Sequence, residues 1–193
     1  ALAVLGNVRD LTLDGLIELA YDPWLPAFEN LLAGLVDAFD AQPRDFPSLA
    51  GPIEQLRSWD RRVRVDSVAM TLAHFYASRW LDEAAAPAGL SRMETLDWFA
   101  ASAPARERLR VFADTVASLE RDFGRWELPW GEVNRFQRLT GDIAQPHDDA
   151  SPSLPVGMAS GRWGALASYG ARRFPGTKKL YGESGNSFVA VVE

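Results

Sequence analysis

The sequence predicts a mainly α-helical protein with a short, strand-containing carboxyl-terminal part. Over residues 1–126, apolar residues recur at steps of three and four, the spacing that places them on one face of a helix. After Trp126 this periodicity is lost, and nine of the 15 glycines fall within residues 127–193. We therefore expect a helical region over 1–126, followed by Gly-rich loops and strands over 127–193.

Two helices are predicted at the start of the chain. The first spans residues 13–21, with Thr12 as its N-cap. Asp22 and Pro23 are expected to end it, and also to cap and begin the second helix. The prolines of the loop over 42–51 disfavour a helix, so the second helix should stop before that loop. Its inward-facing apolar residues are Phe28, Leu31, Leu32, Leu35 and Phe39.

Four more helices are predicted before Trp126. A third begins near Pro52, and the fourth, over 67–86, is apolar around most of its circumference, which indicates a central, buried helix. Phe75 of this helix is expected to be buried. The fifth opens with Ser91 and Glu94 at the spacing of a capping box. The sixth follows a proline and places these apolar residues on one face: Leu109, Phe112, Val116, Leu119 and Phe123.

Two strands are predicted in the carboxyl-terminal part, over residues 165–169 and 187–192. The second is nearly all apolar, as is typical of a strand covered on both faces. Two short strands cannot cover each other, so further strands are expected from outside this sequence. Because Ala1 is not a translation start and 187–193 reads as an interrupted strand, we expect a fragment of a larger protein, able to self-associate through that strand.

Composition excludes several classes of function. The chain has no cysteine, which excludes disulfides, thiolate metal sites and a cysteine nucleophile. A net charge of −6 would repel a phosphate backbone, so nucleic-acid binding is not expected. The longest apolar runs are far shorter than the roughly 18 residues that a membrane span needs.

Two groups of residues could carry chemistry. His74 lies among apolar residues of the fourth predicted helix, and a packed histidine bonded to a carbonyl or carboxylate is favoured over a catalytic base. His147, Asp148 and Asp149 form a cluster that could hold a cation. It has no recognised ligand spacing, so a solvated loop is the favoured interpretation.

Acidic residues and serines give no clear active site. Most of five aspartates occupy positions where a helix N-cap or first-turn acid is stabilised by the helix dipole. These are Asp10, Asp14, Asp22, Asp60 and Asp66. Serines near glycines, at 160, 184 and 187, miss the spacing of a nucleophile elbow. The glycines at 157, 161, 164 and 170 match neither a dinucleotide fingerprint nor a P-loop. No catalytic or metal-binding residue is therefore predicted, and substrate-binding residues stay unknown.

Three stretches resemble the β chain of the penicillin acylase family, most closely its acyl-homoserine-lactone and aculeacin acylase branches. Residues 9–28 read RDLTLDGLIELAYDPWLPAF, residues 130–135 read WGEVNR, and residues 182–193 read GESGNSFVAVVE. Together they frame nearly the whole chain. One departure is Asn134, where the family often has histidine.

The resemblance implies an amidase made as a precursor, or zymogen, that cuts itself and exposes a serine at the start of the β chain. That serine attacks an N-acyl amide, with its own α-amino group as base. None of the catalytic residues can be placed in this sequence. The only candidate for an arginine beside the oxyanion-binding asparagine is Arg9, which lies a few residues too late. Any family calcium site also uses residues outside this sequence, and no cofactor is expected.

The chain would therefore be the helical spacer segment of an αββα N-terminal nucleophile hydrolase, with the first residues of its return to the central sandwich. Its partners would be the rest of the β chain and the α chain of the same precursor. We expect a periplasmic or secreted enzyme acting on a small acylated amide, and an isolated segment without activity. The alternative is a non-enzymatic helical interaction module, which an exposed apolar groove between the second and sixth predicted helices would favour.

Overall fold

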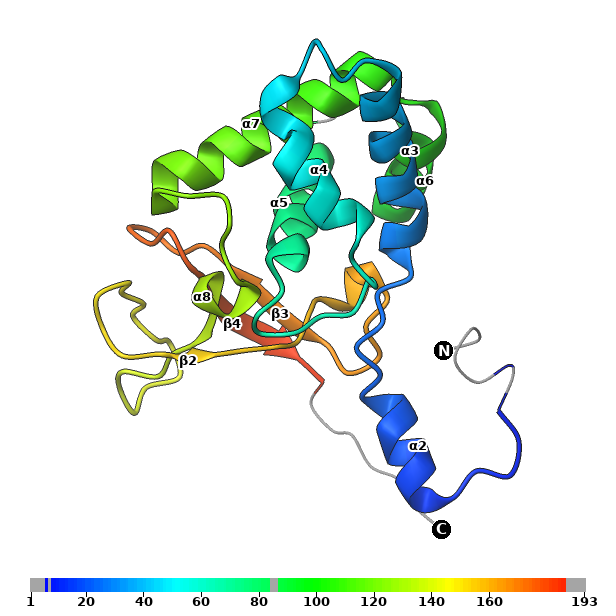
Figure 1. Cartoon of the computed structure of the whole chain (residues 1–193). Helices are drawn as coiled ribbons and strands as arrows, with labels where there is room; N and C mark the ends of the chain where they lie inside the picture. Colours follow the sequence, from blue (N-terminus) through cyan, green and yellow to red (C-terminus); the bar gives the residue numbers. More distant parts are fainter. Residues whose placement is uncertain (1–5, 7, 84–86, 187–193) are drawn as a thin grey trace.

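The computed structural model describes residues 6, 8–83 and 87–186 and is about half helical. The helices are α2 (Leu13–Ala20), α3 (Ala27–Ala41), α4 (Ala50–Arg57), α5 (Val68–Glu83), α6 (Arg92–Ser102), α7 (Ala105–Phe123) and α8 (Trp130–Val133), with 3-10 turns at Pro47–Leu49 and Gly161–Trp163. The strands are β1 (Asn134–Phe136), β2 (Leu154–Pro155), β3 (Tyr169–Arg172) and β4 (Leu180–Gly185). The prediction of a mainly helical protein with a short β part is confirmed (Figure 1).

Helices α3 to α7 form a bundle around α5, which packs against α3, α4, α6 and α7. The predicted central position of this helix is thus confirmed. Periodic apolar residues explain the packing, because α3 and α7 each turn one apolar stripe inward. The interior holds a cluster of aromatic rings in which Tyr76 lies 5.7 Å from Phe99 and 5.5 Å from Phe112, between ring centroids.

Side-chain caps mark the starts of α2 and α6, as predicted. The Thr12 hydroxyl accepts a hydrogen bond from the Gly15 N–H, and Ser91 with Glu94 forms the predicted capping box at the start of α6. The third predicted helix begins at Ala50, close to the expected position. These caps satisfy backbone N–H groups that have no partner within the helix.

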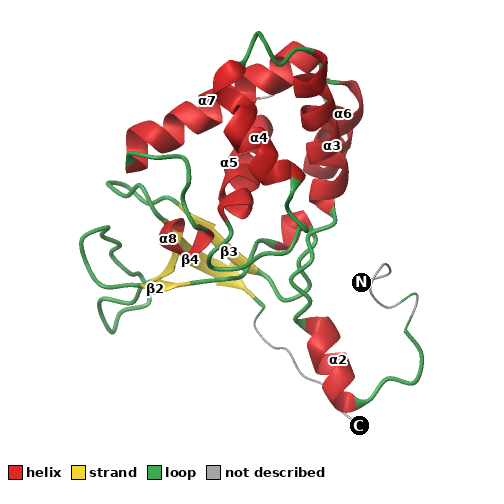
Figure 2. Cartoon of the chain, in the orientation of Figure 1, coloured by secondary structure: helices red, strands yellow, loops and turns green. Residues whose placement is uncertain are grey.

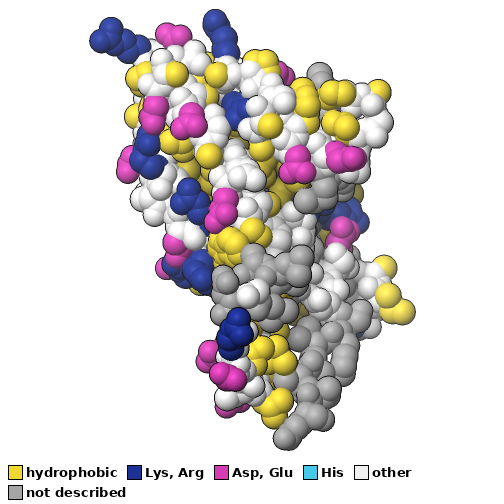
Figure 3. Space-filling view, turned by 90° about the vertical axis from the view of Figure 1, so that its right-hand side faces the viewer, with side chains coloured by type: hydrophobic (Ala, Val, Ile, Leu, Met, Phe, Trp, Pro, Cys, Tyr) yellow, Lys and Arg dark blue, Asp and Glu magenta, His cyan; other side chains and the backbone are white. Residues whose placement is uncertain are grey.

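Helix α2 projects from the lower side of the bundle (Figure 1), and none of its residues is buried. Hydrophobic side chains are open to solvent on this small lower projection in the side view of Figure 3. In α2 and the residue after it, the side chains of Leu13, Ile17 and Tyr21 are 46%, 44% and 55% exposed. Leu13 and Ile17 lie one turn apart on the helix, so an apolar face of α2 is uncovered in the described structure.

The strands form one mixed sheet below the bundle, in the order β2-β1-β4-β3 (Figure 2). Strand β4 pairs in parallel with β1, where Asn134 faces Leu180, and antiparallel with β3. The strand predicted over 165–169 is right only at its last residue, because β3 begins at Tyr169. A 3-10 turn that ends at Gly164 precedes the strand, and the chain joins the sheet only at Tyr169. The strand predicted over 187–192 lies outside the described residues.

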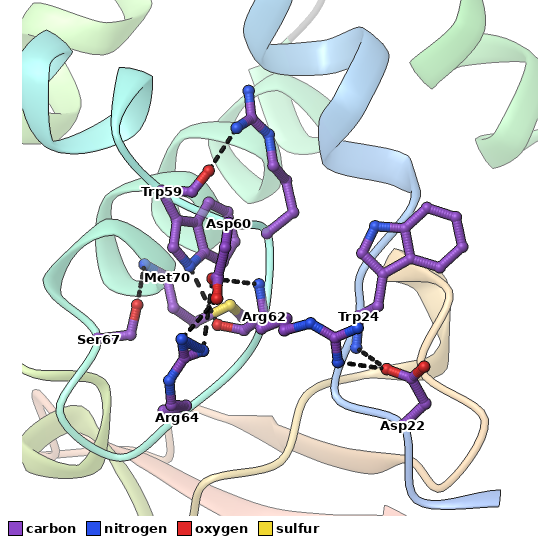
Figure 4. Close-up of polar contacts among 9 residues, drawn as sticks. Asp22, Trp24, Trp59, Asp60, Arg62, Arg64, Ser67 and Met70 are labelled. Carbon is purple, nitrogen blue, oxygen red and sulfur yellow. Dashed lines mark hydrogen bonds and ion pairs between the residues drawn. The ribbon is translucent and has the colours of Figure 1, made fainter. Parts of the chain in front are cut away.

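A polar strap fixes the segment between α2 and α3 to the loop between α4 and α5 (Figure 4). We define it as residues 22–25 together with 59–64. Leu25 N–H donates to the Arg61 carbonyl, and Val63 N–H donates to the Pro23 carbonyl, at 2.9 Å each. The Asp22 carboxylate accepts from the Trp24 N–H at 2.9 Å and from the Arg62 guanidinium at 2.8 Å.

These contacts correct two of the capping predictions. Asp22 does not cap the second helix, since its carboxylate is used by Arg62, and α3 begins only after Pro26. The Asp60 carboxylate likewise accepts a hydrogen bond from the Arg62 N–H and forms an ion pair with Arg64. Both carboxylates therefore form ion pairs with arginines instead of interacting with the amino-terminal end of a helix.

The remaining aspartates behave differently from one another. Asp14 lies in the first turn of α2, as predicted. Asp10 stands outside any helix, with a positive φ of 59°. Asp66 precedes Ser67, and it is the Ser67 hydroxyl that accepts the Met70 N–H, at 3.1 Å, in the first turn of α5.

Candidate functional site

A cleft of about 540 Å³ opens between the bundle and the sheet, with α5 and α7 on one side and β3 and β4 on the other. Its volume is in the range of small-molecule sites. Helix α5 contributes His74 and Phe75, and the turn before β3 contributes Ser160 and Arg162. The cleft thus brings together two of the residue types singled out in the sequence, the histidine and the serines.

His74 is held on its side of the cleft by aromatic rings. Its Nδ1 accepts a hydrogen bond from the Trp163 indole N–H at 3.2 Å. The imidazole centroid lies 4.8 Å from the Trp130 ring and 5.5 Å from the Phe75 ring. Because an indole N–H can only donate, Nδ1 is the acceptor, and the imidazole carries its proton on Nε2.

These surroundings make His74 a hydrogen-bond donor rather than a base. Desolvation by the enclosing rings, with a smaller contribution from the positive charge of Arg162, lowers the pKa of His74 to about 3. The favoured interpretation of a packed histidine is right, although its partner is the indole of Trp163 instead of a carbonyl or carboxylate. An imidazole of this pKa remains neutral near pH 7.

We expect His74 to stay neutral on acidification until about pH 4, as followed by NMR of its ring protons. The unfolded chain takes up a proton near pH 6.5, while the folded chain does so only near pH 3. The free energy of unfolding should therefore fall as pH drops from about 6.5 towards 3. The variant His74→Gln serves as the control, since it should lose this part of the pH dependence. A ring titration with a midpoint near 6.5 would contradict the expectation.

The serines of the cleft do not meet His74 as a nucleophile would. The Ser160 hydroxyl accepts the Arg162 N–H at 3.4 Å and caps the 3-10 turn. Ser184 lies on β4 opposite Gly170. Ser187 lies outside the described residues. Phe75, predicted to be buried, is only partly so and lines the cleft.

Residues 147–149 connect their own loop to the segment around β4 through ring contacts and hydrogen bonds. The His147 ring lies between Phe174, at 4.1 Å, and Tyr181, at 4.9 Å, measured between ring centroids. The Asp149 carboxylate accepts the Lys178 N–H at 2.6 Å and the Tyr181 hydroxyl at 3.0 Å. The prediction of a solvated loop is therefore wrong for His147 and Asp149, which are partly buried. Within residues 6, 8–83 and 87–186, no group of three or more acidic or histidine side chains could hold a metal ion.

The WGEVNR stretch is a hydrogen-bonded joint between α8, β1 and the segment around β2. The Trp130 indole N–H donates to the Met158 carbonyl at 3.0 Å. The Asn134 amide donates to the carbonyls of Val156 and Met158, at 2.8 and 3.0 Å. Arg135 donates to the Gly131 carbonyl at 2.6 Å. The side chains of Trp130, Asn134 and Arg135 each donate to backbone carbonyls, and Glu132 pairs with Arg125, so the contacts of the stretch are structural.

Charge in the cleft is unevenly distributed. Glu83 pairs with Arg79, and Glu183 pairs with Arg172. The cleft is lined by five arginines, Arg79, Arg121, Arg162, Arg172 and Arg173, and by three acidic residues, Asp82, Glu83 and Glu183.

This grouping of arginines could hardly be predicted from the sequence. Only the neighbours Arg172 and Arg173 form a visible pair, and Arg79 and Arg121 lie on separate helices. The arginines meet only because α5 and α7 both face the same pair of strands.

Comparison with known proteins gives one clear match. The family model described as penicillin amidase covers residues 1–193. A search of curated proteins finds no match.

Among the described residues, no helix has the length and apolar character needed to cross a membrane.

Proposed function

Since the chain belongs to the penicillin amidase family, we propose that it is a structural segment of a self-processing acylase that hydrolyses N-acyl amide bonds. The match over residues 1–193 is the observation that carries this proposal. The nucleophile would be a serine at the start of the β chain, outside this segment. The parent protein is accordingly a hydrolase made as a precursor with other chains.

The proposed reaction needs no base from this segment. The α-amino group of an N-terminal serine has a pKa near neutrality, so it can accept the hydroxyl proton during attack on the amide carbonyl. Backbone N–H groups and an asparagine side chain would stabilise the oxyanion. His74 has a low pKa, and its Nδ1 is hydrogen-bonded to Trp163. Both observations support a general base that lies outside the cleft.

The segment would act as the helical spacer of the β chain, with the sheet of β1 to β4 leading into an αββα sandwich. The hydrogen-bonded joint at 130–135 supports this role, because it fixes the helices to the strands. A periplasmic or secreted location, and a substrate such as an N-acyl-homoserine lactone or a lipopeptide, belong to the same proposal. Any calcium ion would bind residues elsewhere in the precursor.

The interaction-module alternative depended on an exposed apolar groove between α3 and α7. The apolar residues of these helices face each other, and Leu35, Leu109 and Phe112 are completely buried. Their burial removes the feature that would have favoured the alternative.

Two measurements test the proposal. The full-length precursor should separate into two chains, and amino-terminal sequencing of the second should begin with serine. A precursor with that serine changed to alanine is the matched control and should remain uncut. A mature, active protein that runs as one uncut polypeptide would overturn the proposal.

The isolated 193-residue chain should release no product from a panel of N-acyl amines with short to long acyl groups, while the processed enzyme does. Turnover by the isolated chain that disappears on mutation of a residue within it would show that the segment carries its own active site.

A further inference from the structure

Helix α2 presents a stripe of apolar side chains that the described structure leaves open. We define the α2 face as Leu13, Ile17 and Tyr21, which follow one another at steps of four and are each about half exposed. The Tyr21 N–H still donates to the Ile17 carbonyl at 3.2 Å, so Tyr21 continues the same side of the helix. An exposed apolar stripe on a projecting helix is typical of a contact surface.

The polar strap holds the α2 face in a fixed position. The Asp22 carboxylate, directly after Tyr21, pairs with Arg62 at 2.8 Å (Figure 4). Three residues further on, Leu25 is completely buried, and its N–H donates to the Arg61 carbonyl at 2.9 Å. A surface that is already fixed loses less conformational entropy on contact than a flexible one, so this joint favours docking.

Acidic side chains border the α2 face on one side. Asp14 and Glu18 are exposed and lie four residues apart, so they form one edge beside the apolar stripe. Neither forms an ion pair with any residue that the structure describes, and α2 contains no lysine or arginine. The complementary surface is therefore apolar, with lysine or arginine along one edge.

Two other occupants match the α2 face less well. A second copy in antiparallel contact would set the acidic edges of the two helices against each other. Three half-exposed side chains would also bury far less than the roughly 800 Å² per partner of a stable interface. An anionic membrane would repel Asp14 and Glu18, whereas helices that lie on such membranes carry lysine or arginine on their polar face.

From these observations we propose that the α2 face docks on a part of the same precursor outside residues 1–193, on an apolar surface edged by lysine or arginine. This inference rests on the proposed function, since it requires the larger precursor. Contacts between parts of one folded precursor are intramolecular. Three side chains are therefore sufficient where a separate partner would need a larger area.

Hydrogen exchange followed by mass spectrometry over residues 11–21 tests the contact. In the processed enzyme these amides should exchange at least about tenfold more slowly than in the 193-residue chain, because docking suppresses local opening of α2. Self-cleavage is followed separately by gel electrophoresis. Equal exchange in the chain and in a correctly cut enzyme would overturn the docking inference and leave the proposed function intact. A precursor that stays uncut would count against the proposed function, and exchange within that uncut polypeptide would still test the docking.

Two substitutions separate the apolar and the charged parts of the contact. Ile17→Ala keeps a good helix former, and Glu18→Lys places a cation near the carboxyl-terminal end of α2, where the helix dipole favours it. In the processed enzyme, Ile17→Ala should speed exchange of α2 about tenfold through lost apolar burial. Glu18→Lys should speed it about two- to threefold through the lost ion pair.

Matched controls make the same substitutions elsewhere. Ile143→Ala changes a fully exposed isoleucine in the loop between β1 and β2, and Glu120→Lys changes an exposed glutamate near the end of α7. Both should leave the exchange of α2 unchanged. Exchange that neither Ile17→Ala nor Glu18→Lys alters, or that the controls alter equally, would contradict the proposal.

The 193-residue chain by itself tests the other occupants. It should show neither a dimer nor vesicle binding that depends on Ile17, as measured by sedimentation and by flotation with vesicles of phosphatidylcholine and phosphatidylserine. A dimer that Ile17→Ala abolishes would assign the α2 face to a second copy. Vesicle binding that Ile17→Ala abolishes would assign it to a membrane. Either result would overturn the proposal.

Discussion

Trp163→Ala is expected to lower the free energy of unfolding by about 3–5 kcal/mol, through lost apolar burial and the cavity left behind. Trp163 is completely buried. Its ring centroid lies 5.1 Å from that of Phe28 in α3, and its indole N–H donates to His74 in α5. One side chain thus joins two helices to the turn that precedes β3.

Urea unfolding measures this loss, and a second substitution separates its causes. Trp163→Phe keeps most of the apolar volume but removes the N–H, so we expect a smaller loss of about 1–2 kcal/mol. The partly buried Trp98, which packs at the edge of the same core, is a comparison residue of equal size. A loss below about 1 kcal/mol for Trp163→Ala would mean that the turn and the helices are not coupled through this ring.

Gly164→Ala is expected to cost about 2–4 kcal/mol, because two effects add at this position. Gly164 has a φ of +99°, which residues with a Cβ rarely adopt. A Cβ built there would also lie 2.5 and 2.6 Å from Cγ and Cδ of Pro26. The proline ring is rigid, so the chain itself would have to move.

A second glycine offers a control for the backbone effect. Gly176 has a similar φ of +85°, but a Cβ there meets nothing within 4 Å. Gly176→Ala should therefore cost only about 1 kcal/mol, from backbone conformation alone. Thermal unfolding of both variants gives the difference, which reports the contact with Pro26. Equal losses would show that this contact carries no energy.

The helices could be predicted because their signals are local. An apolar stripe and a cap such as Thr12 or Ser91 depend on neighbours within a few residues, and these predictions hold. Asp22 has the same local appearance, but its partner Arg62 is 40 residues away. Sequence proximity cannot show which of two favourable partners a carboxylate takes, so that cap was misassigned.

The sheet and the cleft depend on distant contacts. β1 is a three-residue strand that contains Asn134 and Arg135, so it shows no alternation of apolar and polar residues. The WGEVNR stretch was recognisable as a family motif, but its role as a joint to the carbonyls of Val156 and Met158 appears only in three dimensions. The same holds for the arginines of the cleft, which four separate segments of the chain supply.

The parallel pairing of β1 with β4 bears on how quickly the protein folds. Residues 137–179 intervene between the two strands, so bringing them together closes a long loop before any contact between them forms. The helices need only short-range contacts for their first turns, and such contacts form faster. The bundle should therefore assemble early, while the sheet, and with it the cleft, completes in a later and slower step.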